Sequence, residues 1–276
     1  MKLGVLVFPL DGTMHPGDLA SAAEERGFES IWYPEHSHLP LSSSNWPGGS
    51  VIPDAYAKTM DQFVCMTAAA MATSTIQIGS GICLVPQHHP AWLAKQVASL
   101  DVLSGGRVIL GIGYGWNPAE LGDHGVAFSQ RREVAREVVW AMKSLWADEI
   151  ASYSGTHIQI SESKVWPKPL QRPHPKIVIG AGAGPKLYAA IADYADGWGP
   201  MRARDEIDAH IEPIRQAMSD AGRDPATLDI TVFNAPTDVA GLDELRERGV
   251  TRALFNVPAA GADRVLPVMD TLAALG

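Results

Sequence analysis

Residues 176–198 read KIVIGAGAGPKLYAAIADYADGW, and the fold prediction starts from this stretch. An apolar strand runs into Gly180, Gly182 and Gly184, and Pro185 then opens an amphipathic helix. Glycine lets the backbone approach a ligand closely, and the first N–H groups of a helix have no intrahelical partner. The stretch therefore predicts a strand, a glycine turn and a helix N-terminus that together can hold a phosphate group.

A purely structural role of this glycine turn is the alternative. Glycine-rich turns between a strand and a helix also occur without ligands, where they only permit close packing. The spacing is not G-x-G-x-x-G, so this turn does not indicate a dinucleotide-binding fold.

An alternation of strand and helix extends from this stretch in both directions. The remaining expected strands are 2–8, 28–33, 76–85, 108–113, 228–233 and 252–257, and the remaining expected helices are 15–26, 57–73, 90–103, 131–146, 204–221, 242–248 and a last one that ends at residue 275. About eight strand–helix units result, which predicts an α/β fold of the (β/α)8 TIM barrel type. A doubly wound open sheet is the alternative, but it leaves no role for so regular an eighth unit.

Two insertions interrupt the alternation. A long loop over 34–54 follows the second expected strand, and loops at the C-terminal ends of barrel strands lie on the active face. We therefore expect this loop to act as a substrate lid. Alternating residues over 150–160 predict a small hairpin after the fourth helix, and the prolines within 167–175 predict an extended connector.

Length and composition predict one globular unit. The chain has 276 residues, of which 46% are hydrophobic and 19% charged, so it supplies a large core and has too little charge for a disordered protein. A single barrel domain over 1–276 is expected, because such a barrel needs about 250 residues. The net charge of −9 disfavours nucleic acid as a partner, since phosphate backbones are bound by clustered Lys and Arg.

The cysteines and the apolar runs bear on the compartment. Cys65 and Cys83 lack C-x-x-C spacing, so we expect two buried thiols in a reducing cytoplasm rather than a disulfide framework. The apolar run at the N-terminus is short and has no cleavage site like that of a secretory signal, so it is expected to be a strand. No run of 18 apolar residues occurs, so no membrane span is expected.

Candidate catalytic residues follow the second strand in the run WYPEHSH. Glu35 and His36 lead, because an imidazole titrates near neutrality and an adjacent carboxylate can tune it. A surface histidine beside a solvated glutamate is the alternative. No metal site is expected, because His36 with His38 lacks a third ligand at recognisable spacing, and the same holds for the pair at 88–89.

Glycines mark two further strand ends. Gly81 and Ile82 interrupt the third strand, and glycine inside a strand often marks a bulge or the close approach of a ligand. Gly113 ends the fourth strand, and Asn117 and Glu120 follow it. Together with the glycine turn described above, these strand ends predict a flat ligand across the barrel mouth; for each alone, internal packing is the alternative.

The combination of motifs resembles a known family. The run GSGICLVPQHHPAWLAKQVASLDVLSGGRVILGIGYGWNPAEL, with WYPEHSH before it and the glycine turn after it, resembles the bacterial luciferase-like monooxygenase superfamily. More narrowly, it is similar to the actinobacterial oxidoreductases that use the deazaflavin coenzyme F420. The resemblance covers roughly residues 1–260 and adds a homodimer as an expectation.

The resemblance implies site residues as well as a fold. It implies a (β/α)8 barrel with an isoalloxazine-type ring across the C-terminal mouth. Glu35 and His36 match the acidic–histidine pair at the reacting edge of the ring, although well-known deazaflavin relatives carry Asp at the first position. The implied cofactor-binding residues are Gly81 and Ile82 as a bulge behind the ring, Asn117 and Glu120 as polar positions, and Ala181, Gly182, Ala183 and Gly184 as the phosphate loop.

The function implied is hydride transfer between F420 and a small organic substrate, with His36 as the acid or base and Glu35 beside it to polarise it. Trp46, Trp116 and Met201 are candidates for an apolar substrate pocket, with Trp46 the leading one. The first alternative keeps the fold and replaces F420 by reduced FMN, which makes the protein an oxygen-using monooxygenase. The second alternative is a protein that binds a flavin or deazaflavin without catalysis.

Overall fold

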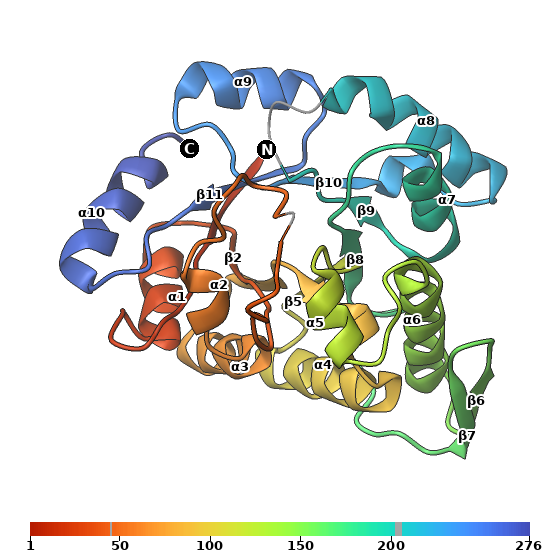
Figure 1. Ribbon diagram of the computed structural model, residues 1–276. Coiled ribbons are helices and arrows are strands. Elements are labelled where there is room, and N and C mark those ends of the chain that lie inside the picture. The colour runs from red at the N-terminus through yellow and green to blue at the C-terminus, as the bar shows by residue number, and fades with distance from the viewer. Residues whose placement is uncertain (45, 202–205) are drawn as a thin grey trace.

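The computed structural model describes residues 1–44, 46–201 and 206–276 of the chain (Figure 1). Its main sheet is a closed parallel barrel, as the alternation predicts. The barrel strands are β1 (Lys2–Leu6), β2 (Ser30–Tyr33), β3 (Gln77–Ser80), β5 (Val108–Gly113), β8 (Lys176–Ile179), β9 (Gly197–Trp198), β10 (Asp229–Val232) and β11 (Arg252–Asn256). Each strand pairs with its neighbour in chain order, β11 pairs with β1, and all these pairs are parallel.

Closure of the barrel depends on the third and fourth strands of the wall. Ile78 and Gly79 of β3 pair with the start of β5, and the short β4 (Cys83–Leu84) pairs with the end of β5. The expected strand 76–85 is therefore divided into two pieces, β3 and β4, and the peptide bond between Gly81 and Ile82, which is cis, lies between them.

Helices cover the outside of the barrel (Figure 1). They are α1 (Pro16–Glu25), α2 (Ala55–Lys58), α3 (Gln62–Ala72), α4 (Pro90–Ser104), α5 (Pro118–Asp123), α6 (Arg131–Ala147), α7 (Pro185–Tyr194), α8 (Ile207–Asp220), α9 (Val239–Glu247) and α10 (Ala262–Ala273), with 3₁₀ turns η1 (Val85–Gln87) and η2 (Pro225–Thr227). Among the described residues, no helix is both long enough and apolar enough to cross a membrane.

Two helix predictions need correction or restriction. The single helix expected over 57–73 is wrong: α2 ends at Lys58, Thr59 is extended, and Asp61 caps a new helix by accepting a hydrogen bond from the Val64 N–H at 2.8 Å. A side-chain acceptor before an apolar run favours a helix start, and the prediction missed this signal. Helix α8 lies within the expected helix 204–221, whose first two residues lie outside the described part of the chain.

Apolar side chains fill the barrel and the layer between strands and helices. The interior cluster has two large aromatic residues, Trp32 and Phe233, whose rings meet edge to face at 5.8 Å. The other fully packed members are Leu6, Ile109, Val178 and Leu254, and Ile82 lies partly buried against them. The interior is therefore a packed core rather than a channel, and the open end of the barrel is bounded by Ile82.

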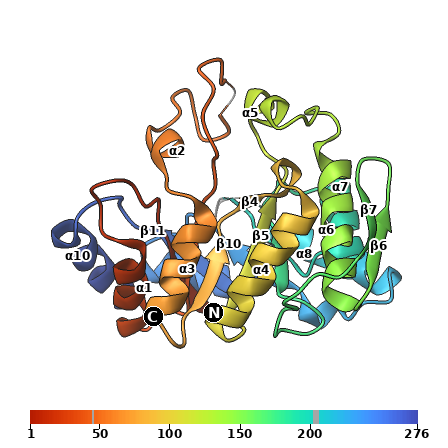
Figure 2. The same cartoon turned by 90° about the horizontal axis from the view of Figure 1, so that it is seen from below.

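The insertions lie where the sequence places them. β6 (Ala151–Ser154) and β7 (Gln159–Ser163) form an antiparallel hairpin beside α6. The connector over 167–175 has no helix or strand. The loop over 34–54 also has none in its described residues, with residue 45 outside them. In Figure 2 this loop and α5 rise above the same end of the barrel.

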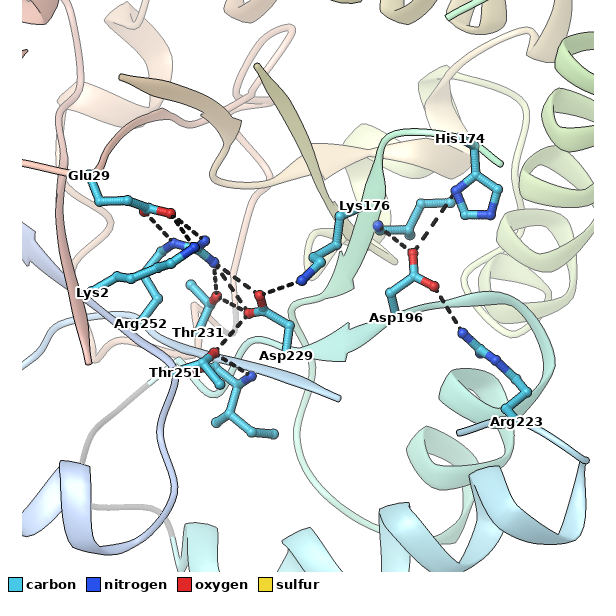
Figure 3. Close-up of polar contacts among 12 residues, drawn as sticks. Lys2, Glu29, His174, Lys176, Asp196, Arg223, Asp229, Thr231, Thr251 and Arg252 are labelled. Atoms are coloured by element: carbon cyan, nitrogen blue, oxygen red, sulfur yellow. Dashed lines mark hydrogen bonds and ion pairs between the residues drawn. The ribbon is translucent and has the colours of Figure 1, made fainter. Parts of the chain in front are cut away.

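The opposite, N-terminal end of the barrel carries a network of charges centred on the buried Arg252 and Asp229 (Figure 3). The Arg252 guanidinium, 3% exposed, donates to the carboxylates of Glu29 and Asp229, and Lys176 lies 3.1 Å from Asp229. Thr231 and Thr251 donate further hydrogen bonds to Asp229. These residues belong to or precede four barrel strands, so the network ties the strands together at the end away from the glycine turn.

Candidate active site

The floor of the barrel mouth is Ile82. A Cβ placed on Gly113 would lie 2.3 Å from the Ile82 Cδ1, and one on Gly180 would lie 2.8 Å from the same atom. Glycine at the ends of β5 and β8 is therefore required to make room for this side chain. The same argument explains Gly79, whose Cβ would meet the Trp32 ring at 2.2 Å. Part of the glycine pattern is thus explained by internal packing, and its result is an apolar platform.

His36 follows β2, the strand that neighbours β3 in the barrel wall, and a carboxylate lies behind its ring. Its Nδ1 lies 2.9 Å from one oxygen of Glu120 and 3.2 Å from the other, and the Ser37 N–H also donates to Glu120. The side chains of His36 and Glu120 are 5% and 1% exposed. Since a carboxylate only accepts hydrogen bonds, Nδ1 carries the proton. The Nε2 then accepts a long hydrogen bond of 3.4 Å from the Trp116 indole N–H.

The expected pairing of Glu35 with His36 is wrong. The Glu35 carboxylate accepts from the Leu84 N–H at 2.5 Å and lies 2.9 Å from the His88 Nε2. Consecutive residues of this extended segment direct their side chains to different elements. The carboxylate that orients His36 is Glu120, which the sequence placed only among the cofactor-binding positions.

Glu35, Cys83 and His88 form a second cluster. Their potential ligand atoms lie within 4.8 Å of one another, a grouping that the sequence spacing did not show. Burial raises the pKa of the Cys83 thiol well above its ordinary value, and the charge of Glu35 adds to this effect. The cluster consists of an ion pair between Glu35 and His88 with the Cys83 thiol beside it.

Aromatic side chains form the wall on the lid side. Tyr56 on α2 lies between the rings of Trp46 and Trp116, with ring centroids 5.7 and 6.2 Å from its own. Its ring also lies 4.9 Å from His36 and 5.2 Å from Phe8. The structure thus brings Trp46 and Trp116 together beside His36. Sequence reasoning missed Tyr56 because this residue falls between the loop expected over 34–54 and the helix expected over 57–73. Neither expectation placed it at the barrel mouth.

Met201 lies on the other side of the platform. A Cβ on Gly180 would be 3.5 Å from its sulfur, and its carbonyl accepts a hydrogen bond from the Asn234 amide at 2.9 Å. Its side chain is 39% exposed. The three candidate pocket residues therefore flank the mouth from two sides rather than forming one group.

Polar contacts tie the loop over 34–54 to α5 and its C-terminal end. His38 Nε2 lies 2.9 Å from the Asp123 carboxylate, and the Ser37 hydroxyl lies 2.7 Å from His124 Nε2. The same hydroxyl lies 2.9 Å from His38 Nδ1. These groups are exposed at the rim, whereas His36 is buried one residue earlier. The difference in burial separates His36 from His38 as a candidate for chemistry.

Asn117 occupies a helix cap. Its carbonyl oxygen accepts from the Ala119 N–H at 3.1 Å, and its amide donates to the Ser43 hydroxyl at 2.8 Å. The residue is 1% exposed. Its side chain thus starts α5 and holds the lid, and both ends of the amide are already engaged.

The glycine turn lies at the N-terminus of α7. Gly182 and Ala183 are exposed, and no described residue accepts a hydrogen bond from the N–H groups of Gly182, Ala183 or Gly184. The cap residue Gly184 has φ of 141°, and Pro185 occupies the first helical position. A Cβ on Gly182 would meet nothing within 4 Å. The turn therefore presents open backbone donors at the positive end of a helix.

Comparison with known proteins identifies the family. The family model described as luciferase-like monooxygenase matches residues 14–264. The chain belongs to the luciferase-like monooxygenase family. This membership also makes it an oxidoreductase by class, as the sequence resemblance predicts.

Relatives within the family share much of the chain. An uncharacterized protein of Mycobacterium tuberculosis is 37% identical over 280 residues, which cover 99% of this chain and 98% of the relative. The F420-dependent hydroxymycolic acid dehydrogenase of the same organism is 31% identical over 213 residues, covering 76% of this chain and 55% of that protein.

Solved structures share the fold of this chain. Monooxygenase RslO1 from Streptomyces bottropensis superposes with a TM-score of 0.82 at 21% identity, covering 99% of this chain and 98% of that one. An F420-dependent secondary alcohol dehydrogenase, in complex with an F420–acetone adduct, gives 0.76 at 18% identity and covers 100% and 98%. At these identities the likeness establishes the barrel and leaves the cofactor to be argued from the residues.

The luciferase-like barrel presented here fits a ring with a phosphate-bearing tail. The partly buried Ile82 offers an apolar surface for one face of a ring, and the open N–H groups at Gly182 and Ala183 offer donors to an anion. A side chain larger than glycine at 180 would displace Ile82. The described residues therefore suit such a cofactor at both of its chemically distinct ends.

Proposed function

We propose that this protein is an F420-dependent oxidoreductase that transfers a hydride between the deazaflavin and a small organic substrate. The observation that carries the proposal is the buried pair of His36 and Glu120 at the exit of β2, whose Nδ1 and carboxylate oxygen lie 2.9 Å apart. A relative that is F420-dependent by name, the hydroxymycolic acid dehydrogenase, supports the cofactor assignment.

Two groups of residues are proposed to hold the cofactor, one at its ring and one at its phosphate. Gly81 and Ile82 back the ring, and residues 181–184 receive the phosphate at the start of α7. Glu120 acts through His36, and Asn117 acts by holding α5 and the lid in place. When bound, the deazaflavin supplies a two-electron hydride acceptor or donor.

His36 is the proposed proton carrier. Its Nδ1–H is held by Glu120, so its Nε2 carries the lone pair that takes a proton from the substrate. Glu120 stabilises the imidazolium that forms, because it places a negative charge within hydrogen-bond distance of Nδ1. The long contact from Trp116 is easily given up, which leaves Nε2 available to a substrate.

The substrate is proposed to bind against the aromatic wall. Trp46, Tyr56 and Trp116 present partly exposed apolar surface beside His36, whereas charged side chains there are already paired. An uncharged organic molecule with a hydroxyl or carbonyl group suits this pocket. We also propose that the protein works in the cytoplasm, where its two buried thiols, Cys65 and Cys83, stay reduced.

A second candidate function is that of an FMN-dependent monooxygenase, because the fold is shared with monooxygenase RslO1. Oxygen separates the two functions, since a deazaflavin does not readily activate it. Anaerobic incubation of the protein with oxidised F420 and a panel of alcohols should bleach the visible band of the cofactor. Turnover that appears only with reduced FMN and oxygen would favour the monooxygenase.

A further inference from the structure

Glu35 and His36 are neighbours in sequence but serve different elements. His36 is directed to Glu120 on α5, as described above. Glu35 is directed to the segment 81–88, which includes Ile82, β4 and η1. The stretch that follows β2 therefore carries His36 and, through Glu35, also contacts the segment that contains Ile82.

The Glu35–His88 contact is a partly buried ion pair. The side chains are 11% and 22% exposed, and the carboxylate lies 2.9 Å from the imidazole. Burial alone would raise the pKa of Glu35, but the hydrogen bond and charge of His88 outweigh it, so the pKa is lowered. The pKa of His88 is raised, because Glu35, aided by Asp61, outweighs the effect of burial. Both pKa shifts favour the charged forms of the two partners.

The ion pair fixes one end of the segment 81–88, and a backbone contact fixes the other. The Gly81 N–H donates to the Tyr33 carbonyl at 2.7 Å, and the Leu84 N–H donates to Glu35. Ile82 lies between these two anchors, and both anchors come from the exit of β2. The height of Ile82 in the barrel mouth thus depends on the same four-residue stretch that carries His36.

We infer that Glu35 and His88 are positioning residues that hold the Gly81–Ile82 platform at the height where a bound ring meets His36. The inference rests on the proposed function and assigns Glu35 a role different from polarising His36. Neither residue exchanges a proton with the substrate in this account. Their effect reaches the reaction through the placement of Ile82.

The first test uses the apoprotein and needs no cofactor. Hydrogen–deuterium exchange should accelerate in the peptide that covers 81–88 when Glu35→Ala removes the acceptor for Leu84. Glu24→Ala is the matched control, because Glu24 also accepts from backbone N–H groups, those of Thr75 and Ile76, at the opposite end of the barrel. The control should leave exchange at 81–88 unchanged. Unaltered exchange at 81–88 in a folded Glu35→Ala protein would show that Glu35 does not hold this segment in place.

The second test uses F420. Glu35→Ala should weaken F420 binding about tenfold and change the visible circular dichroism of the bound ring, because the platform moves. Glu35→Gln keeps an acceptor for Leu84 and should restore most of the affinity, which provides a fallback if the alanine variant unfolds. A double Glu35→Ala, His88→Ala variant should bind no more weakly than the single one, since the pair acts as a unit.

The outcomes separate the inference from the proposed function. If the wild-type protein fails to bind F420, the proposed function fails. The exchange experiment then still decides whether Glu35 holds the segment 81–88 in place. If the wild type binds F420 and Glu35→Ala binds it with the same affinity and the same dichroism, the positioning role is wrong. Additive losses from Glu35→Ala and His88→Ala would also contradict it.

Discussion

His36 is held by three neighbours that differ in strength. Glu120 accepts a hydrogen bond from its Nδ1–H at 2.9 Å, and the Trp116 indole N–H donates to its Nε2 at 3.4 Å. The Tyr56 ring packs against the imidazole. The strong contact fixes the orientation of the imidazole, while the weak one leaves the reactive nitrogen exchangeable. A buried histidine with this asymmetry is suited to exchange a proton with a substrate at Nε2.

Loss of His36 should therefore appear in the rate. Positioned acids and bases contribute about 10²–10⁴-fold, so His36→Ala should lower kcat by that factor and leave F420 affinity nearly unchanged. Steady-state kinetics with any substrate found in the alcohol panel gives kcat, and fluorescence quenching gives the affinity.

His38→Ala is the control for this prediction. His38 is 42% exposed and is bound to Asp123 at the rim, so its removal should change kcat much less. Turnover near the wild-type level in a folded, F420-loaded His36→Ala protein would remove His36 from the mechanism and leave a solvent proton in its place.

The N-terminus of α7 is the element that most directly reports on the phosphate. A carboxylate at Ala183 would face the open N–H groups and the positive end of the helix, so it would compete with a bound anion and block its site. Ala183→Asp should reduce F420 binding below detection, while far-ultraviolet circular dichroism stays that of the folded protein. Unchanged affinity would show that the glycine turn is only structural.

The elements differ in how well the sequence predicts them. The barrel, the hairpin over 150–160 and the connector followed from periodicity and proline spacing, because these signals are local. The break between α2 and α3 did not, because Thr59 and Asp61 interrupt an otherwise helical composition over only three residues. A short break is invisible to a pattern that averages over several turns.

Side-chain directions were beyond the reach of the sequence. Sequence reasoning placed Glu35, His36 and Glu120 at the mouth, but it could not tell which carboxylate faces the imidazole, since that depends on α5 reaching across to the β2 exit. The glycines at 113 and 180 were attributed to a ligand, whereas they first accommodate Ile82. Contacts between distant segments decide such questions, and spacing along the chain does not encode them.

On the scale of the whole molecule, the charge network at the N-terminal end should govern acid stability. Burial alone would raise the pKa of Asp229, but the charges of Arg252 and Lys176 outweigh it, so the pKa is lowered. The pKa of Glu29 is lowered by Arg252 in the same way. A lowered carboxyl pKa contributes stability above the ordinary value of about 4, and this contribution is lost as the pH falls through the lowered value.

Arg252→Leu tests this network. At pH 7 the change leaves the buried Asp229 and the partly buried Glu29 without their common partner. It should cost about 3 kcal/mol of unfolding free energy, the low end for a broken buried ion pair, because Lys176 and Lys2 still face the two carboxylates. Well below pH 4 the cost should shrink, because the carboxylates are then neutral in both proteins. Urea unfolding at the two pH values measures both differences. A cost that does not depend on pH would show that Arg252 stabilises the barrel by packing alone.

The homodimer expected from the family resemblance has a candidate surface. Val64 and Met71 on α3 are 67% and 68% exposed, and Trp92 and Leu103 on the adjacent α4 are 68% and 55% exposed. An apolar face of this kind favours association. Light scattering after size-exclusion chromatography should give twice the chain mass for the wild type, and Val64→Glu with Trp92→Glu should give a monomer. A monomeric wild type would contradict the expectation.

The identity of the bound cofactor is the most direct test of the proposed function. Fluorescence quenching of the purified apoprotein, titrated with F420 and with FMN under the same conditions, compares the two affinities directly. We expect F420 to bind more tightly than FMN. Binding of FMN at least tenfold tighter than F420, a difference of about 1.4 kcal/mol, would contradict the cofactor assignment and make the protein an FMN enzyme on the same barrel.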